Sequence, residues 1–186
     1  MVKRVKIEDF DYIPRKGKIA IQLREDDELI NVKLTSGEDE ILIAGSNGKV
    51  IRFEEDEVRP MGRTASGVRG FNTDGGTVVG VAVSHEGKYL LSVSENGYGK
   101  RSEIDEYRKT NRGSKGVKTI NVTTKTGSLV AVRAVNGDED AMIVTDKGII
   151  IRIALDHVGV YGRNTQGVKL INVADDEMVT KVAVVA

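Results

Sequence analysis

Short apolar runs alternate with turn-forming residues along the whole chain, and this pattern predicts β-strands. One stretch holds four of them: KVIRF (49–53), a segment over 67–71, VVGVAV (78–83) and YLLSVS (89–94). The runs are rich in Val, Ile and Leu and are bounded by Gly, Asn and Asp, which is typical of strands and of the turns between them. No amphipathic helix of useful length interrupts the pattern. The chain is therefore expected to be all-β.

The strand that ends at residue 94 is followed by a turn dipeptide, and the same happens at two other places. The three dipeptides are Asn47-Gly48, Asn96-Gly97 and Lys147-Gly148. Asn-Gly between two apolar runs is the strongest short hairpin signal, because a type I′ turn needs a positive φ at both central residues. We expect the strands on either side of each dipeptide to pair.

The chain also repeats itself four times. One marker is an Arg followed four residues later by an acid and six residues later by an apolar residue. It occurs as Arg4, Glu8 and Phe10, as Arg52, Asp56 and Val58, as Arg101, Asp105 and Tyr107, and as Arg152, Asp156 and Val158. A second marker, which we call the elbow, is a basic segment with a closing glycine. Elbows 1 to 4 span 14–21, 61–71, 111–120 and 161–171, and their closing glycines are Gly17, Gly67, Gly116 and Gly167.

Two markers that share one period near 50 residues predict a propeller, a solenoid or a similar array. The units of this single repeat domain run over about 1–48, 49–97, 98–148 and 149–186, and each is expected to form a four-stranded antiparallel blade. The fourth unit lacks its own last strand, and the first lacks the preceding one. Either the chain is part of a longer array, or its two ends complete one shared blade.

The composition excludes several classes of protein. The chain has 186 residues, 28 basic and 28 acidic side chains, no Cys and two His. No apolar run reaches the roughly 18 residues of a membrane span, and the first residues lack the apolar segment of a secretory signal. Without Cys, thiol chemistry and Cys-based zinc sites are ruled out. No catalytic constellation, calcium loop or phosphate-binding glycine motif is present, so we expect no catalytic residue, no metal ligand and no cofactor site.

The net charge is zero, but the two signs are segregated. Four windows that overlap the elbows, 15–18, 59–69, 108–118 and 163–169, contain thirteen basic residues and no acid. We call these residues the elbow cations: Arg15, Lys16, Lys18, Arg59, Arg63, Arg69, Arg108, Lys109, Arg112, Lys115, Lys118, Arg163 and Lys169. Because the units repeat, the elbows are expected to project from corresponding edges as a positive stripe, which can follow a phosphate backbone.

Two interpretations of the elbow cations remain open at this point: a solvated face, or a site for an anionic polymer. Basic residues in β-turn loops are commonly just solvated, which favours a solvated face. The lack of acids in four equivalent windows favours a site for an anionic polymer about equally. The strand arginines Arg4, Arg52, Arg101 and Arg152 differ, since each lies in an apolar run with an acid four residues on. For these we favour a structural ion pair or a hydrogen-bonded brace in each blade, with phosphate contact as the alternative.

Three segments carry a resemblance to a known family: VRPMGRTASGVRGF (58–71), SENGYGKRSEIDEY (94–107) and YGRNTQGVKLINVADDE (161–177). They resemble the C-terminal domain of the DNA gyrase A subunit, and the resemblance extends unit by unit over essentially the whole chain. It implies a β-pinwheel, a propeller-like array of usually six four-stranded blades, which binds duplex DNA around a basic outer rim and bends or wraps it. It further implies a cytoplasmic, nucleoid-associated protein whose attached catalytic core introduces negative supercoils at the expense of ATP.

The resemblance has limits that shape the expectation. The four units resemble the last four of the usual six, and the signature Gln-Arg-Arg-Gly-Gly-Lys-Gly of the first blade is absent; the nearest string is NRGSKG (111–116). Only the elbow cations carry over, as phosphate contacts, and this segment is not expected to be an enzyme itself, since ATP and Mg²⁺ would belong to other parts. The expected partners are duplex DNA and the gyrase catalytic core, with no membrane. The alternatives are a protein-interaction module of propeller type and the related domain of topoisomerase IV.

Overall fold

The computed structural model describes all 186 residues, and its regular structure consists almost entirely of strands. The strands are β1 (Glu40–Gly45), β2 (Lys49–Glu54), β3 (Val78–Val83), β4 (Tyr89–Ser94), β5 (Tyr98–Glu103), β6 (Val117–Lys118), β7 (Leu129–Val135), β8 (Asp140–Thr145), β9 (Ile150–Ala154), β10 (Val168–Lys169) and β11 (Val179–Val185). Five 3₁₀ turns complete the set: η1 (Ile7–Phe10), η2 (Glu55–Glu57), η3 (Ser84–Glu86), η4 (Ile104–Glu106) and η5 (Leu155–His157). No helix has the length and apolar character that crossing a membrane requires.

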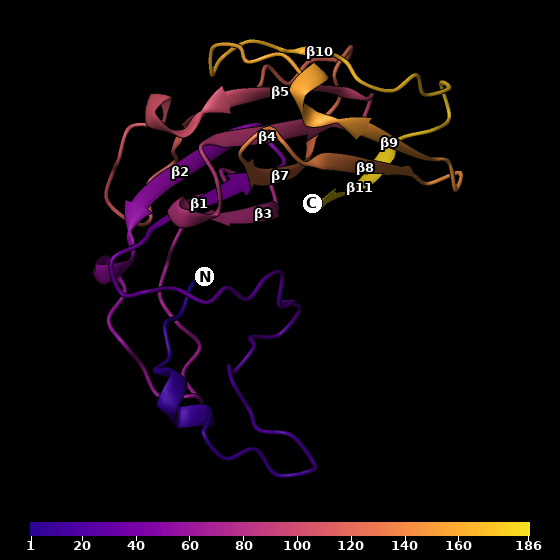
Figure 1. Cartoon of the computed structure of the whole chain (residues 1–186). Helices are drawn as coiled ribbons and strands as arrows, with labels where there is room; N and C mark the ends of the chain where they lie inside the picture. Colours follow the sequence, from indigo (N-terminus) through magenta and orange to yellow (C-terminus); the bar gives the residue numbers. More distant parts are fainter.

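The strands form three antiparallel sheets, which we call blades A, B and C. Blade A has the order β3-β1-β2-β6, blade B the order β7-β4-β5-β10, and blade C the order β11-β8-β9. Figure 1 shows the blades side by side in a curved array, and β7 contacts both β3 and β11, so that these three strands form the inner edges. The all-β, blade-like fold class predicted from the sequence is thereby confirmed, but the chain forms three sheets instead of the expected four four-stranded blades, because residues 1–38 contribute no sheet strand.

The hairpins occur where the turn dipeptides predict them, joining β1 to β2, β4 to β5 and β8 to β9. The predicted type I′ geometry is wrong, because only the glycine of each dipeptide has a positive φ, 78° at Gly48, 84° at Gly97 and 82° at Gly148. The amide of each glycine donates to the carbonyl three residues back. This is the pattern of a three-residue loop, in which a turn is followed by one left-handed residue.

The outer strand of a blade comes from the following elbow. In blade A, β6 of elbow 3 pairs with β2 through Lys49↔Lys118 and Val50↔Val117, and in blade B, β10 of elbow 4 pairs with β5. Elbow 2 makes the corresponding isolated bridge to the N-terminal segment, Val2↔Val68. Each blade therefore holds strands from both sides of the unit boundaries drawn from the sequence, and adjacent blades are tied together by exchanged strands.

The two ends of the chain differ from the middle. Residues 1–38 contribute isolated bridges and the turn η1 but no sheet strand, and Figure 1 shows this segment as loops that extend away from the blades. Its apolar side chains, such as Ile19, Val32 and Leu34, are exposed. Blade C has three strands because no elbow crosses to β9, and Ile150 at the start of β9 is likewise exposed.

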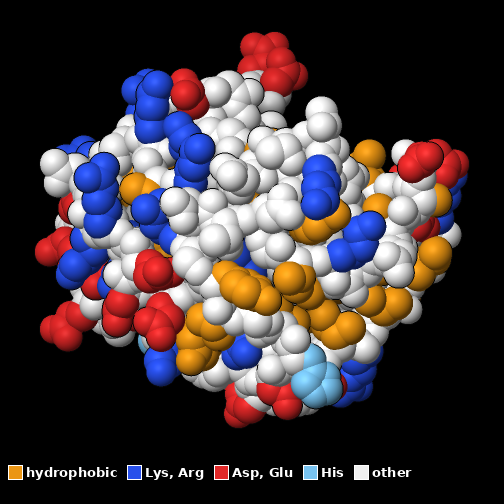
Figure 2. All heavy atoms as spheres, turned by 90° about the horizontal axis from the view of Figure 1, so that it is seen from above, with side chains coloured by type: hydrophobic (Ala, Val, Ile, Leu, Met, Phe, Trp, Pro, Cys, Tyr) orange, Lys and Arg blue, Asp and Glu red, His pale blue; other side chains and the backbone are white.

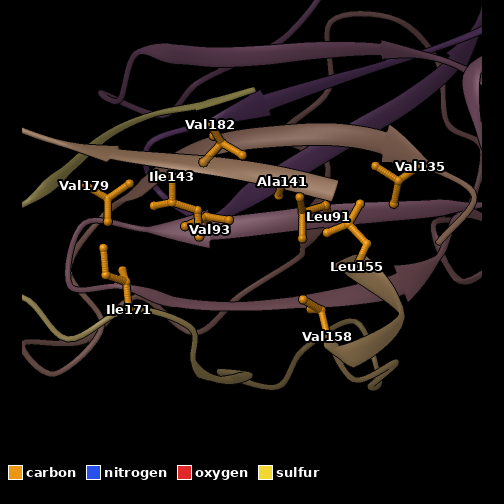
Figure 3. Close-up of a cluster of buried hydrophobic side chains, with 11 residues drawn as sticks. Leu91, Val93, Val135, Ala141, Ile143, Leu155, Val158, Ile171, Val179 and Val182 are labelled. Atoms are coloured by element: carbon orange, nitrogen blue, oxygen red, sulfur yellow. The ribbon is translucent and has the colours of Figure 1, made fainter. Parts of the chain in front are cut away.

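The hydrophobic core lies between the blades rather than within one of them. A cluster between blades B and C draws on β4, β7, β8 and β11 and on elbow 4, and Figure 3 shows its side chains pointing toward one another. A second cluster lies between blades A and B, and a third joins blade A to elbow 2 and to Val2. Because each cluster needs two neighbours, a single blade could not bury its own apolar faces.

The strand arginines act as braces, as expected, but the acid four residues on is never their partner. Arg52 donates from Nη1 to the carbonyls of Ile104 and Tyr107 in the next unit, and its Nη2 lies 2.5 Å from Glu40 Oε2. The other pairings are Arg4 with Glu55, Arg101 with the carbonyl of Val158, and Arg152 with Asp140. The reason is geometric: the acid four residues on lies in or just beyond the turn that follows the strand, whereas the arginine reaches across to a neighbouring strand or blade.

Candidate nucleic-acid interface

Each elbow from the second to the fourth lies against the preceding unit through its closing glycine. A Cβ on Gly67 would lie 2.3 Å from the carbonyl oxygen of Val2, one on Gly116 would lie 2.4 Å from that of Val50, and one on Gly167 would lie 2.3 Å from that of Gly99. All three glycines have a positive φ, which disfavours any other residue. The repeated glycine thus allows the elbow backbone to lie directly on a strand.

We call the edge of the molecule that carries the four elbows the rim. Along the rim, consecutive elbows are joined by a recurring hydrogen bond, which we call the elbow link. An arginine four residues before the closing glycine donates from Nη1 to a carbonyl two residues after the closing glycine of the previous elbow. The links are Arg63 to Ile19 at 2.8 Å, Arg112 to Arg69 at 2.7 Å and Arg163 to Lys118 at 2.7 Å. The four elbows therefore form one connected series, which fixes the spacing of the cations they carry.

A buried lysine supports the fourth elbow from below. Lys100 Nζ donates to the carbonyls of Gly162 and Arg163 at 2.7 and 2.6 Å and to the hydroxyl of Thr165 at 3.2 Å. Its burial, with a smaller contribution from the charge of Arg163, lowers its pKa to about 8. Lys3 holds the carbonyl of Arg63 in the same way, and burial likewise lowers the pKa of Lys3.

Six of the thirteen elbow cations already have partners within the protein. Arg63, Arg112 and Arg163 form the elbow links, and Lys18 donates to a backbone carbonyl. Lys109 lies 2.6 Å from Glu54 and 3.1 Å from Glu40, whose hydrogen bonds raise its pKa, and Lys115 lies 3.2 Å from Asp74. Five of the six have partners in other units, which the sequence does not reveal, and only Lys18 has its partner, the carbonyl of Asp9, in its own unit.

The other seven elbow cations are exposed and form no hydrogen bond or ion pair through their side chains. We call them the free elbow cations: Arg15, Lys16, Arg59, Arg69, Arg108, Lys118 and Lys169. Figure 2 shows the face seen from above in Figure 1, where basic side chains lie in several groups and acidic ones lie mainly at the margins and at one side. The rim therefore presents positive charge that the protein itself does not neutralise.

Two lysines beside the rim, Lys49 and Lys125, are not among the elbow cations. Lys49 is the strand partner of Lys118, and two like charges directly opposite each other in an antiparallel pair repel. Lys125 and Lys169 both place Nζ 5.6 Å from the centre of the Tyr98 ring. Lys49 follows a hairpin and Lys125 lies in a loop, and both lie outside the elbows. Their position beside elbow cations becomes clear only from the pairing of an elbow with the preceding blade.

The comparisons with known proteins agree with this architecture. The family model described as "DNA gyrase C-terminal domain, beta-propeller" matches residues 1–36, 39–85, 88–136 and 139–186. The DNA gyrase A subunits of two Staphylococcus aureus strains, MRSA252 and NCTC 8325, are each 49% identical over 186 residues, which is 98% of this chain. This chain spans 21% of the length of those relatives.

Two solved structures share the fold. The C-terminal domain of DNA topoisomerase IV superposes with a TM-score of 0.91 at 22% identity, over 99% of this chain and 58% of that one. A DNA gyrase A C-terminal domain superposes with a TM-score of 0.81 at 26% identity, over 92% of this chain and 59% of that one. Since the family model matches all four repeats and the relatives align over nearly the whole sequence, the chain belongs to the family of DNA gyrase C-terminal domains.

Proposed function

We propose that the chain binds duplex DNA along the linked elbows and bends it, through phosphate contacts of the free elbow cations. The observation that carries this proposal is that seven exposed cations lie in the acid-free windows that overlap the elbows and have no anionic partner in the protein. A series of unneutralised cations on successive units fits the repeated negative charges of a nucleic-acid backbone. Such contacts position the DNA and carry little sequence information.

The pairing of Lys49 with Lys118 is a second argument that the ligand is anionic. Lys49 and Lys118 are directly opposite each other in the antiparallel pair, so their side chains share one face of the sheet, and neither forms an ion pair with a carboxylate. This repulsion reduces the stability of the pair until an anion lies between the two groups. A phosphate oxygen has the charge and the acceptor capacity that such a position needs.

Bending requires that several contacts act together. Smoothly bending a site of 20–30 base pairs by 40–90° costs about 1–6 kcal/mol, which contacts on several elbows must supply. The blades form a curved array, and the elbow links connect one elbow to the next around it. In a complete gyrase, this bent segment would be presented to the catalytic core that supercoils DNA with ATP in the cytoplasm.

The test is a titration of the protein against a duplex of about 40 base pairs at two salt concentrations. If six to ten phosphates are contacted, affinity should fall by about 10³–10⁵-fold between 50 and 200 mM salt. A second duplex of unrelated sequence should bind with similar affinity, because phosphates rather than bases are read. Absence of binding at 50 mM salt would contradict the proposal and would favour a protein partner for the rim.

A further inference from the structure

Some arginines of the rim bind a neighbouring elbow through an elbow link, and others have no partner. What we infer from this difference rests on the proposed function. We propose that Arg112 and Arg163 are positioning residues for DNA binding, which fix the backbone at Arg69 and Lys118 so that the side chains of those two residues contact phosphates. Arg112 and Arg163 themselves remain bound to the neighbouring elbow. The elbow link would thus set where along the rim successive phosphates are held.

Arg163 is held at both of its ends. Its Nη1 lies 2.7 Å from the carbonyl oxygen of Lys118, and its own carbonyl accepts a hydrogen bond of 2.6 Å from Lys100. The residue is half-buried, whereas Lys118 is exposed. To contact a phosphate with the same Nη1, Arg163 would have to release the carbonyl of Lys118, and hydrogen bonds to a charged donor are among the costlier ones to break.

Arg112 forms the same link with a different support. Its Nη1 lies 2.7 Å from the carbonyl oxygen of Arg69, while its amide donates to the carboxylate of Glu57 at 2.7 Å. The position that Lys100 occupies beneath elbow 4 is taken by the buried Ile51 beneath elbow 3. Because the support changes and the link stays, the link is the feature that the two elbows have in common.

In the second and third links, the residue whose carbonyl accepts the hydrogen bond is itself a free elbow cation. The carbonyls of Arg69 and Lys118 are bound, while their side chains have no partner and are exposed. Holding the backbone of a contacting residue in place lowers the entropy lost when its side chain binds a ligand. The first link differs, since Arg63 binds the carbonyl of Ile19, a residue whose side chain carries no charge.

A double-mutant cycle tests the proposal, with Arg163→Gln, Lys118→Gln and the combined variant titrated against the 40-base-pair duplex at several salt concentrations. Lys118→Gln is expected to lower affinity about tenfold near 0.1 M salt and the salt slope by about 0.9. Arg163→Gln should lower affinity threefold to tenfold in the parent and less than twofold when Lys118 is already replaced. Residues that act through each other show this loss of additivity.

Other outcomes overturn the proposal in distinguishable ways. Additive losses of affinity and of salt slope would mean that Arg163 contacts a phosphate itself. If Lys118→Gln weakens binding while Arg163→Gln does not, the DNA site stands and only the positioning role fails. If Lys118→Gln leaves affinity unchanged, both the positioning role and the proposed contact at Lys118 fail.

The matched control is Arg63→Gln, which removes a link of the same kind whose acceptor is uncharged. It should reduce DNA affinity less than twofold, whereas equal losses for Arg63→Gln and Arg163→Gln would contradict the positioning role. Should Arg163→Gln lower the unfolding midpoint enough to disturb the fold, the cycle of Arg112→Gln with Arg69→Gln provides the same test in elbow 3. There the coupled result supports the proposal and the additive result overturns it.

Discussion

Replacing Arg69, Arg108, Lys118 and Lys169 together by Gln is expected to lower duplex affinity about 10³-fold or more near 0.1 M salt. These four residues are exposed elbow cations without partners in the protein. Each phosphate contact contributes a salt slope of about 0.9, which corresponds to nearly tenfold in affinity at that salt concentration. The slope should therefore fall by about three to four, as measured by titrations at several salt concentrations.

A control variant separates contact from net charge. Lys33, Lys88, Lys147 and Lys181 lie outside the elbows, and their combined replacement by Gln removes the same number of charges. It should reduce affinity by less than about tenfold and leave the salt slope nearly unchanged, because charges beyond a Debye length are screened. Equal losses in the two variants would show that overall charge, and not the rim, governs binding.

The second large effect is expected for Gly97→Ala in the hairpin between β4 and β5. The new Cβ would lie 2.3 Å from the carbonyl oxygen of Ile171, and the φ of 84° is itself unfavourable for alanine. Elbow 4 would have to withdraw, which breaks the 2.8 Å hydrogen bond from the amide of Leu170 to the carbonyl of Gly97 and exposes the buried Ile171. We expect about 3–5 kcal/mol of lost stability in denaturant unfolding.

Gly148→Ala is the matched control, because Gly148 occupies the same position in the hairpin of blade C. Its φ is 82°, but no atom lies within 4 Å of the added Cβ, since no elbow crosses to β9. Only the backbone penalty of about 1–2 kcal/mol applies there. If the two substitutions destabilised the protein equally, the close packing of elbow 4 on the hairpin would not be the cause.

Much of the fold could be predicted from the sequence because strand signals are local. The runs 78–83 and 89–94 coincide with β3 and β4, and the three turn dipeptides mark the hairpins. The strand exchange could not be predicted, because β6 and β10 are two-residue strands whose partners lie about 70 residues earlier in the chain. The turn type was also missed, since Asn-Gly fits more than one hairpin loop.

The sequence predicts a set of candidate cations but not which of them already have partners within the protein. The absence of acids in the elbows could be read from the sequence, and it identified the thirteen cations. Which of them are engaged depends on neighbours from other units: Arg163 on Lys118, Lys109 on Glu40, and Lys115 on Asp74. The same holds for the strand arginines, whose partners are set by blade packing and not by a spacing of four residues.

The central claim, that the free elbow cations contact DNA, is tested most directly by lysine protection. The protein is treated with an acylating reagent with and without saturating duplex at 50 mM salt, and modification at each lysine is measured by mass spectrometry. We expect protection of Lys49, Lys118 and Lys169 and unchanged modification of Lys147 and Lys181. Protection of the last two, with Lys118 and Lys169 still fully reactive, would contradict it.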